Sequence, residues 1–135
     1  MTQLKELGGT FTAAENVPAF AAAGTDGNIP VWQPQFNATV TGITFIPSAA
    51  VTADGTNYTV YTVTNKGSGS GSTSVATRSW AATNSVASTP EAMTLSGTAA
   101  NLNVTAGDNI EVVKTHGGTG LAVAVGRIVI TYKRR

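Results

Sequence analysis

The segment 57–65, Asn-Tyr-Thr-Val-Tyr-Thr-Val-Thr-Asn, constrains the fold more than any other part of the chain. It is built almost entirely of β-branched and aromatic residues, and Gly-containing turns bound it on both sides. In a strand, Tyr58 and Val60 lie on one face and Tyr61 and Val63 on the other. Since apolar residues occur on both faces, we expect this strand to be covered on both sides.

The same alternation recurs to the end of the chain. The apolar spacing slips by one residue at Gly42, which indicates a β-bulge there. No segment has a convincing helical period, so seven or eight short strands predict an all-β fold, an antiparallel β-sandwich or jelly roll over residues 37–135. The strands are expected at 38–46, 57–65, 73–80, 91–95, 102–104, 109–116, 121–125 and 128–132.

Residues 1–36 differ from the rest because Pro and Gly interrupt them and their aromatic residues follow no regular spacing. We therefore expect an extended N-terminal arm that is mobile in the free protein and orders against a partner. An arm that packs on its own sandwich is the alternative. The candidate partner-binding residues are the four aromatic anchors Phe11, Phe20, Trp32 and Phe36.

Charge is scarce in this chain. The 135 residues carry a net charge of +1, and only 11% of them are charged, against about 25% in a typical soluble domain. We expect no nucleic-acid partner and no membrane partner, because no strong field and no apolar run of about 20 residues is present. The surface is then either covered by Thr, Ser, Asn and Gly or buried in partners. With the two-sided patterns at 57–65 and 121–125, this predicts an obligate oligomer, a homotrimer above all.

Residue types that carry chemistry are sparse. The chain has one His and no Cys, and we expect neither a catalytic set, nor a metal site, nor a cofactor. His116, oriented by Asp108 or Glu111, could act as a base, but a His that enters a Gly turn is more often a plain loop residue. The run Gly67–Gly71 lacks the Lys and the following helix of a phosphate-binding loop.

Two further groups have a functional and a structural interpretation. Trp32, Tyr61 and Trp80 could form an aromatic platform for a sugar, although core or subunit packing is the commoner role of such residues. The basic tail 133–135 could contact an acidic partner, although solvated ends of this kind are more often only solubilising.

Four stretches, in order, carry a resemblance: Val-Thr-Gly-Ile-Thr-Phe-Ile-Pro at 40–47, Asn-Tyr-Thr at 57–59, Val-Thr-Ala-Gly-Asp at 104–108 and Gly-Thr-Gly-Leu at 118–121. Over about residues 38–132, the chain resembles the small β-sandwich decoration (minor capsid) proteins of tailed bacteriophages, especially those that infect actinobacteria. The resemblance implies a homotrimer that binds the major capsid protein on the outside of the assembled shell and reinforces it.

The same resemblance implies no cofactor and no catalysis, and a protein made in the host cytoplasm that resides on the capsid exterior of the virion. The alternative is a carbohydrate- or receptor-binding β-sandwich such as a fibre head. Exposed, coplanar aromatic rings around Trp80 and Tyr61 would favour that alternative.

Overall fold

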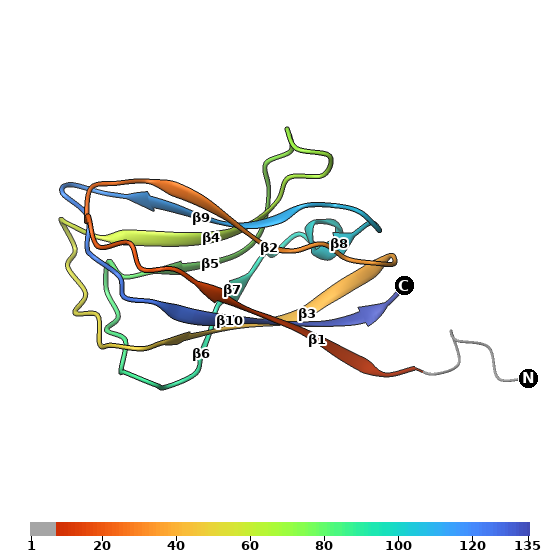
Figure 1. Cartoon of the computed structure of the whole chain (residues 1–135), viewed down its shortest axis with the longest axis horizontal. Coiled ribbons are helices and arrows are strands. Elements are labelled where there is room, and N and C mark those ends of the chain that lie inside the picture. The colour runs from red at the N-terminus through yellow and green to blue at the C-terminus, as the bar shows by residue number, and fades with distance from the viewer. Residues whose placement is uncertain (1–7) are drawn as a thin grey trace, which may run out of the picture.

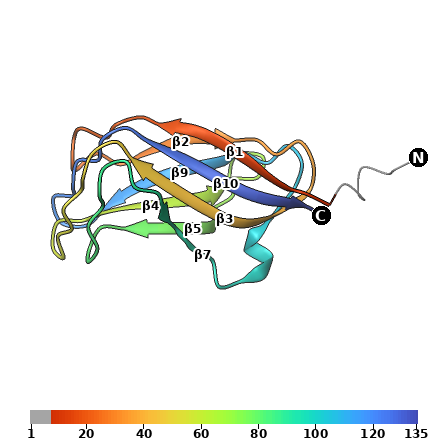
Figure 2. The same ribbon diagram turned by 90° about the horizontal axis from the view of Figure 1, so that it is seen from below.

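The computed structural model describes residues 8–135, which form two antiparallel sheets that face each other (Figures 1 and 2). The fold is all-β and consistent with a β-sandwich. The first sheet has the order β1 (Thr10–Val17), β10 (Gly126–Arg134), β3 (Ala38–Pro47) and β6 (Glu91–Ala92), with β8 (Asn103–Val104) also on β3. The second sheet has the order β2 (Gly27–Trp32), β9 (Ile110–His116), β4 (Thr59–Asn65), β5 (Thr73–Ser79) and β7 (Thr94–Leu95). A short 3-10 turn, η2 (Ala99–Leu102), precedes β8.

The core lies between the sheets, and its centre is an aromatic cluster. Tyr61 and Trp80 are 1% and 0% exposed. Their rings meet edge to face with centroids 5.0 Å apart, and Phe45 packs edge-on at 5.4 Å from Tyr61. Along β4, buried Thr59, Tyr61 and Val63 alternate with less buried neighbours. The face assignment made from the sequence is therefore confirmed for this strand.

The bulge expected at Gly42 is also confirmed. In the pairing of β3 with β10, Gly42 lies opposite Thr131 and Val40 lies opposite Tyr132, so the register shifts at this point and Thr41 is the additional residue. The bulge returns the apolar residues on both sides of it to the core face.

The prediction of a strand at 121–125 is wrong. These residues follow the Gly-rich turn as a loop, and Val123 alone pairs with Phe20 in an isolated bridge. Val123 is buried, whereas Val125 is 45% exposed. The local Leu/Val alternation resembled a strand, but the chain here crosses from one sheet to the other and has no neighbour to pair with along its length.

The expected arm over 1–36 is likewise corrected for the part of it that the structure describes. All eight residues of β1 pair with β10, and β2 pairs with β9. Residues 10–17 and 27–32 are thus edge strands of the two sheets, with no domain boundary at residue 36. The sequence hid them because Glu15 interrupts the inward row of β1, and because Pro30 occurs in β2, where only an edge strand tolerates it. Residues 1–7 lie outside the described part.

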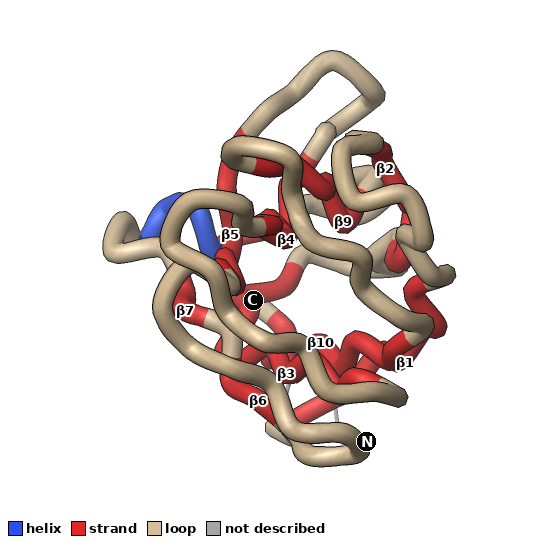
Figure 3. The backbone as a smooth tube through the Cα atoms, turned by 90° about the vertical axis from the view of Figure 1, so that its left-hand side faces the viewer, coloured by secondary structure: helices blue, strands red, loops and turns tan. Residues whose placement is uncertain are grey.

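The connections β1–β2, β3–β4, β5–β6 and β9–β10 lie together at one end of the molecule (Figures 1 and 3). The start of β1 and the C-terminus lie at the opposite end. Hydrogen bonds tie these loops to one another. Ser48 N donates to the Val125 carbonyl at 3.0 Å, and Val51 and Ser85 form an isolated bridge. The long strands therefore end in an interconnected layer rather than in independent loops.

Deleting residues 1–36 should abolish cooperative folding, because it removes one edge strand from each sheet and leaves the hydrogen-bonding edges of β10 and β9 unpaired. We expect the fragment to lose the sigmoidal thermal transition in circular dichroism. A chain that starts at residue 8 is the control, since it keeps every described residue. A 37–135 fragment that unfolds cooperatively would restore the interpretation of a separate arm.

Candidate functional site

Three of the four aromatic residues expected to bind a partner meet at the end of the molecule near the C-terminus. Phe11, Trp32 and Phe36 surround Tyr132 of β10, with ring centroids 5.7, 4.6 and 6.0 Å from the tyrosine ring. Phe11 and Phe36 also touch each other edge to face at 5.5 Å. We call these four residues the aromatic cluster. The sequence identified three members but not the residue at their centre, Tyr132, which it placed only as the end of the expected strand 128–132.

The aromatic cluster is partly satisfied within the chain and partly open to solvent. Phe11 is 38% exposed, and the other three rings are half-buried. The guanidinium of Arg134 lies 5.1 Å from the centre of the Phe36 ring, and Arg135 N donates to the Asn37 carbonyl at 3.0 Å. Part of the basic tail therefore packs against the aromatic cluster. The Phe11 ring is then the most exposed ring of the cluster.

Phe20 lies elsewhere and anchors a loop of its own fold. Its ring packs edge-on against Tyr61 with centroids 5.9 Å apart, and its backbone exchanges two hydrogen bonds with Val123. Gly27 makes this position possible, because a Cβ there would come within 2.8 Å of the Phe20 ring. The structure thus gives Phe20 a packing role in the β1–β2 connection.

A buried ammonium holds the same connection. Lys114 in β9 has no exposed surface, and its Nζ donates to the carbonyls of Ala22 (3.3 Å), Ala23 (2.6 Å) and Thr25 (2.6 Å). Burial lowers the pKa of Lys114, while the nearby Asp26 carboxylate opposes that shift. The sequence held a signal for this site, because Lys114 continues the inward row of Ile110 and Val112.

His116 is oriented by Asp26 and by neither of the carboxylates expected from the sequence. Its Nδ1 lies 2.6 Å from Asp26 Oδ1. Asp108 instead accepts hydrogen bonds from the Asn65 amide and from Thr105 N, and Glu111 accepts one from Asn109. The contact between His116 and Asp26 thus fastens the loop that carries Asp26 to the end of β9.

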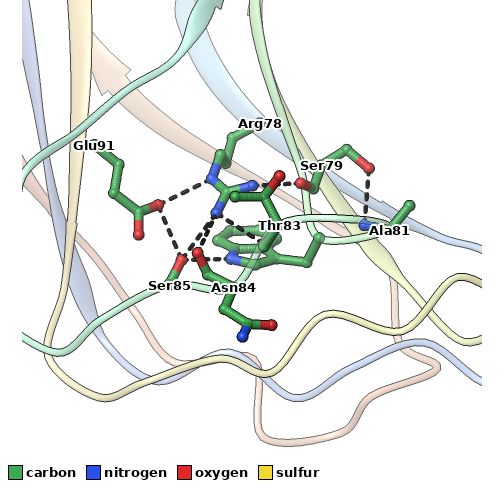
Figure 4. Close-up of polar contacts among 8 residues, drawn as sticks. Arg78, Ser79, Ala81, Thr83, Asn84, Ser85 and Glu91 are labelled. Atoms are coloured by element: carbon green, nitrogen blue, oxygen red, sulfur yellow. Dashed lines mark hydrogen bonds and ion pairs between the residues drawn. The ribbon is translucent and has the colours of Figure 1, made fainter.

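Arg78 and Glu91 form a compact polar network beside the core (Figure 4). Arg78 Nε lies 2.9 Å from Glu91 Oε2, Nη1 donates to the Ser79 carbonyl, and Nη2 donates to the carbonyls of Thr83 and Asn84 and to Ser85 Oγ. A hollow of about 550 Å³ lies next to this network.

Ser85 is the centre of the network and is not free for chemistry. Its hydroxyl accepts from Trp80 Nε1 at 2.6 Å and from Arg78, and donates to Glu91 at 2.9 Å. A hydroxyl has one donor and two acceptor positions, and all three are used. The network therefore locks the 81–90 loop onto the buried Trp80 ring.

The aromatic platform proposed for a sugar is not formed. Tyr61 and Trp80 lie in the core at right angles to each other, whereas Trp32 belongs to the aromatic cluster. The core interpretation of Tyr61 and Trp80 is confirmed. The Tyr61 hydroxyl is buried with no hydrogen-bond partner, and burial raises the pKa of Tyr61.

Within residues 8–135, no three His, Asp or Glu side chains gather where they could hold a metal ion. In that same part of the chain, no helix has the length and apolar character needed to cross a membrane.

Replacing Lys114 by Met should destabilise the fold, because three carbonyls then lose their donor in a buried place. Hydrogen bonds to a charged group contribute about 1.5–3 kcal/mol each, and we expect the free energy of unfolding to fall by about 2–4 kcal/mol in urea titrations. Lys133→Met, at an exposed position, is the matched control and should change it by less than about 0.5 kcal/mol. Equal effects of the two substitutions would contradict the carbonyl site.

Replacing Tyr61 by Phe should leave stability unchanged or raise it by up to about 1 kcal/mol, because the substitution removes a buried hydroxyl that has no partner. The ring contacts with Trp80 and Phe45 are kept. Thermal unfolding monitored by tryptophan fluorescence measures the change. A clear loss of stability would mean that the hydroxyl is hydrogen-bonded in solution.

In comparisons with known proteins, no protein-family model, no curated protein and no solved structure matches this chain.

Proposed function

We propose that this chain is a structural protein that decorates a phage capsid, binding the outer surface of the assembled shell as a homotrimer and reinforcing it. We include in the proposal that the two sheets are a sandwich of the jelly-roll class with seven or eight principal strands, and that the protein is not an enzyme. The partner is then the major capsid protein, and the protein resides on the virion exterior after synthesis in the host cytoplasm.

The observation that carries the proposal is the surface of the first sheet. Between Arg127 and Lys133 of β10, its outward side chains are short and uncharged, as in the cross-strand row Ala14, Val129, Thr44 and Ala92. Thr12 and Thr131 form a second such pair. A surface of this kind suits close packing against another protein better than the capture of a charged small ligand.

The resemblance to decoration proteins gains physical content from two of its four stretches. Asn57 Oδ1 accepts hydrogen bonds from Thr119 N at 2.9 Å and from the Thr119 hydroxyl at 3.0 Å, so the stretches 57–59 and 118–121 meet in space. Residues that hold two loops together are those that a shared fold would keep. The proposal therefore draws on two stretches that lie together in this fold.

The polar clusters support a binding role over a catalytic one. The hydroxyl of Ser85 uses its donor and both acceptor positions, and each of the three guanidinium nitrogens of Arg78 donates to Glu91, to a backbone carbonyl or to Ser85. We assign the contact with the shell to the side of the molecule that carries the aromatic cluster, with Phe11 as its exposed ring.

Light scattering and co-sedimentation test the proposal. We expect a mass of three times 13.7 kDa at micromolar concentration and co-sedimentation with assembled shells that changes little with salt, because few ion pairs are available. Phe11→Ser should weaken sedimentation with shells, whereas Val86→Ser, an exposed valine in the 81–90 loop, should not. A monomeric protein that does not sediment with shells would overturn the proposal.

A further inference from the structure

The two sheets have four edges, and three of them are protected against pairing with another chain. The far edge of the first sheet consists of the two-residue segments β6 and β8, and that of the second sheet is the two-residue β7. The edge strand β2 contains Pro30 and an irregular register beside it. Short strands, proline, bulges and charged side chains, including inward-pointing ones, are devices by which proteins prevent edge-to-edge association.

The fourth edge, β1, is neither short nor interrupted by proline or a bulge, and its one protecting feature is Glu15, a charge in its inward row whose Oε1 accepts a hydrogen bond from Asn16 N. The strand is eight residues long, contains no Pro and no Lys, and pairs with β10 without any shift in register. Its residues are exposed except for Ala13, which is half-buried, and Val17, which is buried. Because β10 occupies only one side of β1, every second residue presents its N–H and C=O to solvent.

We propose that the free edge of β1 receives an extended segment of the shell protein as an additional strand. This inference rests on the proposed function and names the contact through which it would operate. Main-chain hydrogen bonds along the strand would provide affinity, and alternate side chains would provide register.

The side chains of β1 define the chemistry of the segment. The outward residues Thr12 and Ala14 are small and uncharged, so the segment would place small or β-branched residues beside them. Glu15 is the one charged residue of β1, and among residues 8–135 it has no ion-pair partner. The segment would therefore carry Lys or Arg near Glu15, which fixes its register on the edge.

Phe11 makes the edge continuous with the aromatic cluster, because it belongs to β1 and packs on Tyr132. A strand added to β1 would end beside the exposed Phe11 ring. The two features then form one binding surface instead of two.

Residue-resolved hydrogen exchange tests the added strand directly. In the free protein, the β1 amides that face β10 should exchange slowly and the alternate ones quickly. When the protein is bound to assembled shells, the fast set should slow by at least about tenfold, as expected for amides that enter a ladder. A fast set that stays fast in shell-bound protein overturns the inference. So does protection that appears without shells as protein concentration rises, since that outcome assigns the edge to a second copy of this chain.

A matched pair of substitutions gives an independent readout. Ala14 and Ala92 are both exposed and lie in the same cross-strand row at opposite edges of the first sheet. A lysine blocks an edge strand, so Ala14→Lys should weaken shell binding at least about tenfold while Ala92→Lys leaves it unchanged. Equal binding by the two variants, with circular dichroism unchanged, overturns the inference.

These outcomes separate the inference from the proposed function. If the wild-type protein does not sediment with shells at all, the proposed function fails. If it binds shells while the β1 amides and the Ala14→Lys variant are unaffected, the proposed function stands and only the added strand is wrong.

Discussion

The pairing of β10 with two partners is the interaction on which the first sheet depends. This C-terminal strand lies between the N-terminal β1 and β3, and no other ladder joins those two strands. Its inward residues Ile128 and Ile130 enter the core, and Gly126 lets the Phe45 ring approach so closely that a Cβ would meet it at 2.5 Å. Since β1 is the first and β10 the last strand of residues 8–135, this sheet is completed only when segments far apart in the sequence pair. Contacts of such long sequence separation slow folding.

That topology explains which parts of the fold the sequence could predict. Strands that alternate cleanly and pair with neighbours of similar pattern, such as 57–65 and 109–116, lie where the sequence placed them, and so does the bulge at Gly42. The sequence analysis interpreted β1 and β2 as an arm. These segments are strands because they pair with β10 and β9, which lie far along the chain. A local pattern cannot reveal a strand whose apolar row is interrupted by Glu15 or whose ladder tolerates Pro30.

Some features of the candidate site could likewise be predicted from the sequence and others could not. The aromatic residues Phe11, Trp32 and Phe36 stand out in the sequence, but their convergence on Tyr132 requires the tertiary fold. The pairs Arg78–Glu91 and Asp26–His116 are equally invisible, because no local spacing relates their members. Lys114 is the exception. The sequence pattern places Lys114 in the inward-facing row of its strand. A buried cation there requires hydrogen-bond acceptors, and carbonyls of the 18–26 loop supply them.

Scarcity of charge links the surface to the edges of the sheets. A protein with few charged side chains cannot rely on like-charge repulsion to keep its edges apart, so its soluble state depends on strand geometry. Three edges follow that rule through two-residue segments or proline, while β1 keeps a regular ladder on one side, faces solvent on the other, and carries Glu15 as its one charge. An edge of eight residues with a single charge would be disadvantageous for a free monomer with so neutral a surface. It becomes consistent with the rest of the molecule when β1, with the exposed Phe11 ring at its start, is the side that a partner covers.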